Sequence, residues 1–344
     1  MIDLRSDTIT RPTQAMRSAM ASAEVNDDVI DSDPTVAALQ NQIAEMLGKE
    51  AALFMPSGTM TNQVAVRLHC KPGDELLCEA GCHIFKYEQG GFAQLSGVVA
   101  HTIAGHENLL KPEQFQQMIN PDDPHSVRTR LVCLENTHNR GGGRIMPYED
   151  VAAICDWARQ AGLATHLDGA RFFNAVVGSG IDAATWAQHF DTVSVCFSKG
   201  LGAPVGSALV GDQAMMHEIG RHRKLFGGGM RQSGIIAAGA LHGLQHHVER
   251  LADDHAAAQV IAEAVGTCDN LHLEPAAVDT NIVIFRVDAM PASTFCEQLK
   301  AKGVWMLPFS HEHVRAVTHL DVTIEDCQAA AGILCQFAES ISGS

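Results

Sequence analysis

Short apolar runs alternate with amphipathic stretches over the first two thirds of the chain. Helical spacing of the apolar positions predicts helices over 58–70 and 148–162. The apolar runs predict strands over 51–55, 74–79, 129–135, 163–168 and 192–198. Because these strands do not alternate cleanly between apolar and polar residues, and because helices separate them, we expect a parallel sheet covered on both faces.

The pattern changes after about residue 245. We predict, in order, a helix over 248–265, a strand over 280–287, a helix over 291–302, a strand-like segment over 313–322 and a final helix. This order is typical of a smaller α+β domain, so we expect a large domain over 21–245 and a small C-terminal domain over 246–344. Residues 1–20 are expected to form an N-terminal arm that lies on the body of the protein.

The charge balance limits the partners of the chain. With 344 residues the protein is long enough for two domains, and its formal net charge is −16. Such a charge opposes binding to nucleic acid or to an anionic membrane, so neither is expected as a partner. The charged start, "MIDLRSDTIT", predicts no signal peptide, and since no 18 apolar residues follow one another we expect no membrane span.

Ten cysteines are scattered along the chain, several of them inside apolar runs. Because no C-x-x-C pair occurs, reduced and buried cysteines in a cytoplasmic protein fit this distribution best. Cys78, Cys82 and His83 resemble the start of a metal site, but no second pair of ligands follows at a suitable spacing. No metal is therefore expected.

Lys199 stands at an unusual place for a charged side chain. It follows the apolar stretch "VSVCF" and precedes the glycine-rich stretch "GLGAPVG". One interpretation is an exposed lysine at the end of a strand. The other is a functional amine, because α/β sheets bind ligands at the carboxyl ends of parallel strands and partial burial favours the neutral, nucleophilic form of lysine.

Two more polar groups follow predicted strands. Asp168 ends one of them, and Arg171, three residues later, is one candidate partner for its carboxylate. Alternatively, Asp168 faces a protonated ring nitrogen while Arg171 reaches a phenolic oxygen or a substrate carboxylate. At the junction of another strand with a helix, Ser57, Gly58 and Thr59 form either a simple helix cap or an anion site with free backbone N–H groups.

Together these groups match the requirements of one cofactor, pyridoxal 5'-phosphate (PLP). A lysine amine bonds to the aldehyde of PLP, a carboxylate keeps its ring nitrogen protonated, and a helix N-terminus holds its phosphate. An exposed lysine, an ion pair and a helix cap would each explain one of these features alone. They do not explain why all three features occur together at the ends of predicted strands. Lys199, Asp168 and the segment 57–59 therefore predict a PLP-dependent enzyme.

Nine segments occur in an order that is typical of one family. They are "IDLRSDTITRPT" (2–13), "DDV" with "DPTV" (27–36), "GKEAALFMPSGTMTN" (48–62), "HIFKYEQGG" (83–91), "LENTHN" (134–139), "HLDGARFFNA" (166–175), "SKGLGAPVGS" (198–207), "GGGMRQSG" (227–234) and "VRAVTHLD" (314–321). Through them the chain resembles, essentially from end to end, the L-threonine aldolase family of fold-type I PLP-dependent enzymes. The resemblance implies an α/β fold with a mostly parallel seven-stranded sheet in the large domain.

The resemblance also implies which residues bind the cofactor. Lys199 matches the lysine that bonds to PLP, Asp168 matches the partner of the ring nitrogen, and His83 matches the histidine that stacks on the ring. Arg171 matches a residue near the phenolic oxygen. The phosphate cradle corresponds to Ser57, Gly58 and Thr59.

Further residues correspond to the substrate site of the family. Ser6, Arg171 and Arg315 match groups that hold the substrate carboxylate. His125 matches a second active-site histidine, near the substrate hydroxyl. We therefore expect His125 to bias which β-configuration is preferred, and His83, flat against the cofactor ring, to affect overall turnover more.

The resemblance makes oligomerisation part of the active site. Lys224 and Arg231 match basic cofactor-binding residues that a neighbouring subunit contributes, and the family typically forms homotetramers. The chain departs from the family at Ile30 and Asp31, where relatives usually carry Tyr-Gly. This departure affects the expected entrance to the site or a subunit contact rather than the PLP anchors.

The implied reaction is the cleavage of L-threonine or L-allo-threonine, and of other β-hydroxy-α-amino acids, to glycine and an aldehyde. Another fold-type I reaction, β-elimination or transamination, is the nearest alternative and would yield a keto acid. A nicotinamide-dependent dehydrogenase is disfavoured, because the glycines of "GLGAPVG" (200–206) are not spaced as in a dinucleotide-binding loop. A PLP-binding protein without catalytic activity is the remaining alternative.

Overall fold

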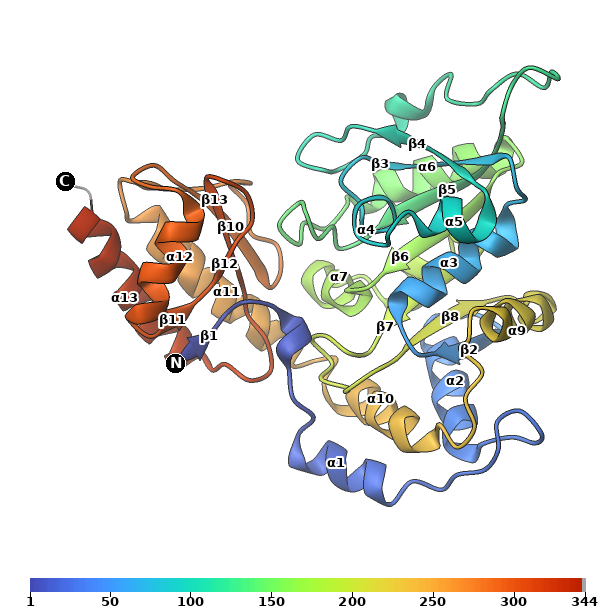
Figure 1. Cartoon of the computed structure of the whole chain (residues 1–344), viewed down its shortest axis with the longest axis horizontal. Coiled ribbons are helices and arrows are strands. Elements are labelled where there is room, and N and C mark those ends of the chain that lie inside the picture. The colour runs from blue at the N-terminus through green and yellow to red at the C-terminus, as the bar shows by residue number, and fades with distance from the viewer. Residues whose placement is uncertain (342–344) are drawn as a thin grey trace.

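A seven-stranded sheet dominates the computed structural model, which describes residues 1–341 (Figure 1). Its strand order is β2-β8-β7-β6-β5-β3-β4, parallel from β7 to β4, while β8 runs antiparallel to β7 and β2. This confirms the predicted mostly parallel seven-stranded sheet. The strands are β2 (Ala51–Met55), β3 (Asp74–Glu79), β4 (Val99–Ile103), β5 (Arg128–Glu135), β6 (Ala164–Gly169), β7 (Thr192–Cys196) and β8 (Ser207–Gly211).

Helices cover both faces of this sheet. Leu77 and Val132 pack in one apolar cluster with α2, α6 and α8, whereas their neighbours Cys78 and Cys133 pack in another with α3. Successive side chains of a strand point to opposite faces, so the two clusters lie on opposite sides of the sheet. The helices of this part are α2 (Pro34–Met46), α3 (Gly58–His69), α4 (His83–Lys86), α5 (Gly91–Ser96), α6 (Tyr148–Gln160), α7 (Phe172–Ser179), α8 (Ala183–Ala187), α9 (Met216–Leu225) and α10 (Gly234–His246), with short 3-10 helices η2 (Pro112–Phe115) and η3 (Gln213–Met215).

A four-stranded antiparallel sheet of order β12-β13-β10-β9 forms the C-terminal part, on the left in Figure 1. Its elements are α11 (Leu251–Gly266), β9 (Leu271–Leu273), β10 (Ile282–Val287), α12 (Ala292–Ala301), β12 (Leu307–Pro308), β13 (His313–Val317) and α13 (Ile324–Ile341). The strands and helices expected here are present. The exact domain ranges 1–20, 21–245 and 246–344 stay a prediction. No helix among the described residues has the length and apolar character needed to cross a membrane.

The N-terminal arm connects the two parts. Strand β1 (Ile2–Asp3) pairs in parallel with β11 (Val304–Trp305), and the 3-10 helix η1 (Asp7–Ile9) follows it. Helix α1 (Gln14–Ala21) packs against α10. In Figure 1 the arm accordingly crosses from the C-terminal sheet to the lower edge of the molecule.

A buried ion pair fixes the arm in place. Arg171, at the end of β6, donates two hydrogen bonds to the Asp7 carboxylate, at 2.6 and 2.7 Å. Asn281, beside β10, donates a third at 3.3 Å. Burial alone would raise the pKa of Asp7, but the charge and hydrogen bonds of Arg171 lower it to about 2. The pair thus joins the arm, the large sheet and the C-terminal sheet.

Replacing Asp7 with asparagine should destabilise the protein by about 3 to 5 kcal/mol, because it leaves the Arg171 charge buried without a counter-charge. Urea unfolding measures the loss. In the unmodified protein the pair contributes fully above the ordinary Asp pKa of 3.8, and this contribution disappears as the pH falls towards about 2.

Asp3 provides a matched control on the same arm. Its carboxylate pairs with Arg5, but both side chains are roughly a quarter exposed. Asp3→Asn should cost less than about 1 kcal/mol. Similar losses in the two variants would contradict the central position of Asp7.

Candidate active site

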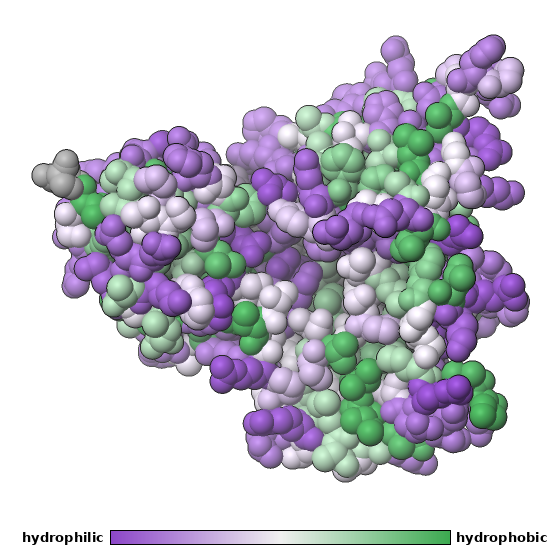
Figure 2. Space-filling view, in the orientation of Figure 1, coloured by the Kyte–Doolittle hydropathy of each residue, from purple (hydrophilic) through white to green (hydrophobic). Residues whose placement is uncertain are grey.

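A pocket of about 360 Å³ opens where the ends of the large-sheet strands meet the arm and the C-terminal sheet. Figure 2 shows the surface hollowed along this boundary. The arm, the large-sheet loops and the C-terminal sheet all contribute to its lining. The lining residues are Ser6, Thr8, His83, Tyr87, Asn139, Arg171, Lys199, Leu307, Pro308, Phe309 and Arg315.

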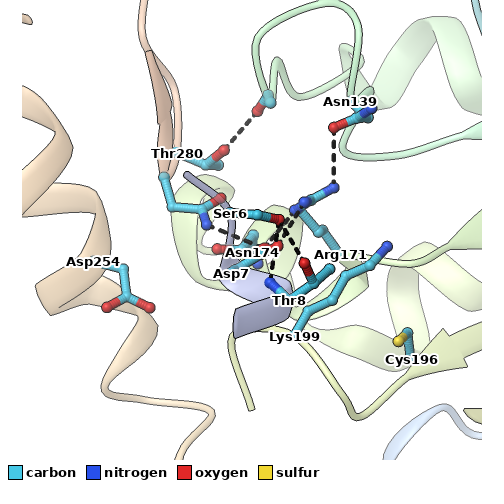
Figure 3. Close-up of polar contacts among 12 residues, drawn as sticks. Ser6, Asp7, Thr8, Asn139, Arg171, Asn174, Cys196, Lys199, Asp254 and Thr280 are labelled. Carbon is cyan, nitrogen blue, oxygen red and sulfur yellow. Dashed lines mark hydrogen bonds and ion pairs between the residues drawn. The ribbon is translucent and has the colours of Figure 1, made fainter. Parts of the chain in front are cut away.

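Lys199 follows β7 by three residues, as predicted, and lies half-buried at the pocket. Its backbone carbonyl accepts hydrogen bonds from Thr10 Oγ1 at 3.0 Å and from the Gly202 N–H at 2.9 Å. The arm and the glycine-rich turn therefore hold the backbone of Lys199. Among residues 1–341, no hydrogen bond or ion pair engages its side-chain nitrogen. In Figure 3 the side chain extends past Thr8 beside Arg171.

Asp168 lies at the end of β6 and is only 2% exposed. It accepts hydrogen bonds from Asn62 Nδ2 at 2.8 Å and from the Ala170 N–H at 3.1 Å. The expectation that Asp168 could pair with Arg171 is wrong, because Arg171 turns to Asp7 instead. Among residues 1–341 no ion pair engages Asp168, and the His83 imidazole lies close to its carboxylate, within 4.8 Å.

His83 begins helix α4 and lines the pocket. Its Nδ1 lies 2.9 Å from the buried Glu88 carboxylate, and polar atoms of His83, Glu88 and Asp168 lie within 4.8 Å of one another. Burial alone would lower the pKa of His83, but the hydrogen bond to Glu88 and the charge of Asp168 raise it. Burial also raises the pKa of Glu88.

The start of helix α3 carries the segment 57–59. Ser57 caps the helix through a bond from the Met60 N–H, and both Ser57 and Thr59 remain exposed. A Cβ at Gly58 would lie 3.5 Å from Ser207 Oγ, a buried hydroxyl without a hydrogen-bond partner among the described residues. Free N–H groups at a helix N-terminus and a spare hydroxyl suit an anion such as phosphate.

Two guanidinium groups, those of Arg171 and Arg315, meet in the pocket. Arg171 Nη1 and Arg315 Nη1 both donate to Asn139 Oδ1, at 3.4 and 3.2 Å. Arg315 Nε is buried without a hydrogen-bond partner in the described part of the chain, and burial together with the charge of Arg171 lowers the pKa of Arg315. Ser6 lines the same pocket and accepts a bond from Thr8 Oγ1 at 2.9 Å. This cationic corner fits a carboxylate.

Of the predicted site residues, Ser6, His83, Arg171, Lys199 and Arg315 line this pocket, whereas Asp168 and the segment 57–59 do not. Three more, which are His125, Lys224 and Arg231, also lie outside it. His125 is exposed on the connection between β4 and β5, which projects from the sheet at the upper right of Figure 1. Lys224, in α9, and Arg231, bonded to Asp27 at 3.4 Å, are exposed as well. The structure therefore does not bring His125 to the pocket of its own chain, and the roles of all three stay predictions.

Several polar residues of the site were not identified from the sequence. Glu135 is the clearest case, because its buried carboxylate accepts the N–H groups of His83 at 2.6 Å and Asn139 at 2.8 Å and so ties two pocket loops together. All of them lie inside segments that are similar to the family, but nothing in the sequence indicates their partners. They are Asp7, Asn62, Tyr87, Glu88, Glu135 and Asn139.

Comparisons with known proteins agree with this geometry. The family model for beta-eliminating lyases matches residues 3–289. The low-specificity L-threonine aldolase of Escherichia coli (strain K12) is 43% identical over 332 residues, which are 96% of this chain and 97% of that protein. The low-specificity L-threonine aldolase 1 of Arabidopsis thaliana is 40% identical over 334 residues, or 94% of this chain and 93% of that protein.

A solved structure shows the same fold at a greater evolutionary distance. The threonine aldolase of Leishmania major superposes with a TM-score of 0.84 at 18% identity, covering 98% of this chain and 100% of that chain. The family model matches residues 3–289, and the two aldolases above are 40% and 43% identical over nearly the whole chain. A shared fold alone would not give so high an identity. The chain therefore belongs to the beta-eliminating lyase family and, within it, to the L-threonine aldolases.

Proposed function

We propose that this protein is a PLP-dependent aldolase that cleaves L-threonine or L-allo-threonine, and other β-hydroxy-α-amino acids, to glycine and an aldehyde. The observation that carries the proposal is the convergence of Arg171 and Arg315 on Asn139 in the pocket that Lys199 lines. A carboxylate in this corner brings the α-amino group of an amino acid near a lysine. The similarity to L-threonine aldolases selects this reaction among those of PLP enzymes.

The residues present fit PLP. The N-terminus of α3, with Gly58 beside the unpaired Ser207 hydroxyl, suits the phosphate. Asp168 suits the ring nitrogen, and Lys199, whose side-chain nitrogen is unengaged among residues 1–341, suits the aldehyde. His83 lies close to Asp168, as a ring that stacks on the cofactor should. Each functional part of PLP thus has a group to receive it.

Bound PLP supplies an aldehyde that links to amines and a ring that accepts the electrons released when a bond at Cα breaks. Asp168 holds the proton of the ring nitrogen in place, because a buried carboxylate stabilises a positive charge beside it. Arg171, Arg315 and Ser6 bind the substrate carboxylate. Fixing this group orients the remaining bonds at Cα and thereby selects the bond that breaks.

His83 receives the proton of the β-hydroxyl in this scheme. With its Nδ1–H donated to Glu88, the neutral imidazole presents Nε2 as an acceptor in the pocket. His125 stays a second candidate, because the family resemblance matches it to a histidine near the substrate hydroxyl. A raised pKa makes His83 a stronger base, but it also means that His83 is protonated over a wider range of acidic pH.

A homotetramer in the cytoplasm is part of the proposal. Lys224 and Arg231 are exposed and lie outside their own pocket, which suits residues that complete the site of a neighbour. Large apolar side chains are exposed nearby, and Figure 2 shows apolar atoms over α10. Ile30 is 83% exposed, Leu225 64% and Ile235 49%, as expected for a surface that another subunit covers. All ten cysteines are free, which suits a reducing compartment.

β-Elimination is the second candidate, because the matching family is named for it. The two reactions differ in product. With the four stereoisomers of threonine, we expect glycine and acetaldehyde from one or both L-isomers, measured by chromatography and aldehyde trapping. A keto acid as the only product would instead establish elimination or transamination.

The Lys199→Ala protein should fold but lose turnover, and borohydride should attach the cofactor of the unmodified protein to the peptide that contains Lys199.

Glu88→Gln should lower the pKa of His83, because burial then acts without the carboxylate that opposes it. The acidic limb of kcat/KM, expected above pH 6.5 in the unmodified protein, should move to lower pH. NMR titration of the histidines measures the pKa directly. Since the folded-state pKa is raised, the pair stabilises the fold below pH 6.5, and this contribution is lost as the pH rises through the raised value.

Glu79→Gln is the matched control for this test. Glu79 accepts a hydrogen bond from the buried His138 at 3.1 Å, so its loss should change the titration of His138 and leave that of His83 nearly unchanged. An unaltered His83 titration in Glu88→Gln would refute the assigned coupling.

Mixing two inactive proteins, Lys199→Ala and Arg231→Ala, should restore activity. If Arg231 completes the site of a neighbour, a hybrid pair contains one site with both defects and one site with neither. Turnover after proven subunit exchange measures the effect. Exchange without recovery would show that Arg231 serves its own chain, and a mixture of Lys199→Ala with Asp168→Asn should stay inactive because both residues belong to one chain's site.

A further inference from the structure

A buried line of hydrogen bonds lies behind Asp168. Strand β6 places His166 and Asp168 on the same face of the sheet, two residues apart. Thr192, on β7, is the register neighbour of His166. Helix α3 covers this face and contributes Asn62, which contacts both His166 and Asp168. None of these three supporting residues lines the pocket.

The bonds of Asn62 define the orientation of its amide. Its Nδ2 lies 2.8 Å from Asp168 Oδ2 and 2.8 Å from Glu88 Oε1, so each amide hydrogen meets one carboxyl group. Its Oδ1 lies 3.1 Å from His166 Nε2. An amide oxygen only accepts, so His166 must carry its proton on Nε2.

This assignment determines the remaining bonds. His166 Nδ1 becomes an acceptor, and the Thr192 hydroxyl, 3.0 Å away, donates to it. The Thr192 oxygen then accepts from His69 Nε2, also at 3.0 Å. Donors therefore point in one direction, from His69 through Thr192, His166 and Asn62 to Asp168.

Both histidines of this line are neutral in the ordinary pH range. Burial lowers the pKa of His166 to about 3 in spite of the nearby Asp168 charge. Burial likewise lowers the pKa of His69 to about 4, against the charge of Asp191. A neutral imidazole has one donor and one acceptor, as the line requires.

We propose that His166 is a positioning residue that holds the Asn62 amide with both hydrogens towards Asp168 and Glu88, and so fixes the Asp168 carboxylate opposite the ring nitrogen of PLP. The inference rests on the proposed function, because it assigns Asp168 to that nitrogen. Without the donor on His166, the buried Asn62 oxygen has lost its partner, which is unfavourable. The amide is then held on one side only and shifts to regain a donor, so its bond to Asp168 weakens and the carboxylate is fixed less firmly.

The test uses PLP and a PLP analogue that carries carbon in place of the ring nitrogen. The analogue cannot bond to Asp168, so it reports on the pocket without the interaction under study. His166→Leu removes the donor, and His166→Gln keeps an N–H at a similar reach. We expect His166→Leu to weaken PLP binding about tenfold, as for the loss of one hydrogen bond to a charged group. Binding of the analogue should change much less, and His166→Gln should bind both nearly as the unmodified protein does.

His255→Leu is the matched control. His255 Nε2 also bonds to an asparagine oxygen, Asn174 Oδ1 at 2.9 Å, and burial also lowers its pKa, to about 4. Its loss should alter the binding of PLP and of the analogue by the same factor. If His166→Leu does not fold, Thr192→Val removes the next bond of the line with little change in shape and should show the same selective loss on a smaller scale.

Equal weakening of PLP and analogue in the His166 variants would assign His166 a merely structural role and overturn the proposal. Unchanged binding in all variants, or a His166→Gln protein as impaired as His166→Leu, would do the same. The unmodified protein distinguishes the two hypotheses. Failure to bind PLP there overturns the proposed function and this inference together, whereas normal binding without a selective loss in the variants overturns only the role of His166.

Discussion

An ion pair shielded from water joins the first residues of this chain to its pocket. Asp7 holds Arg171 with two hydrogen bonds, and Asn281 adds a bond from the C-terminal sheet. Arg171 in turn shares Asn139 with Arg315, so the positions of both guanidinium groups follow from that of Asp7. Because a buried charge without its partner is costly, the arm cannot leave while the rest stays in place. The cationic corner formed by Arg171 and Arg315 therefore keeps its geometry only while the arm is attached.

The charges of the site are separated into two groups. The acidic group surrounds His83 and consists of the carboxylates of Asp168, Glu88 and Glu135. The cationic group consists of Arg171 and Arg315, near the arm. The Asn62 amide lies between Glu88 and Asp168 and donates a hydrogen bond to each of them. His83 donates to Glu88 as well. The cationic group fits the carboxylate of an amino acid, and the acidic group fits the protonated ring nitrogen of the proposed cofactor. The separation of charge therefore suits the proposed flow of electrons from the substrate to the ring.

Apolar runs predict five of the seven large-sheet strands, because burial on both faces requires continuous apolar residues there. Strand β4 lies at the sheet edge and exposes alternate residues, so it has no such run. The residues that we assign to the proposed cofactor could be found from their strand-end positions and from the similarity to a family. Their partners could not, since Asp7 and Arg171 are 164 residues apart and the nearby Asp168 offers a more obvious match. The proposed role of Arg231 in a neighbouring site rests on the family resemblance alone, because the structure of one chain does not show what a second subunit would contribute.

The connectivity of the arm also affects how the protein is made. Ile2 pairs with Val304, and the Leu4 carbonyl accepts the Val317 N–H at 2.8 Å, so residues of the arm are synthesised long before their partners in the C-terminal part. Closing so long a loop is entropically unfavourable until the intervening parts have folded. The large sheet can assemble during translation, but the Arg171 corner lacks its buried counter-charge until the arm docks. Substrate recognition should consequently arise only after the strands that hold the arm have been synthesised, and a nascent chain released before then would carry the sheet and the lysine without the means to orient an amino acid.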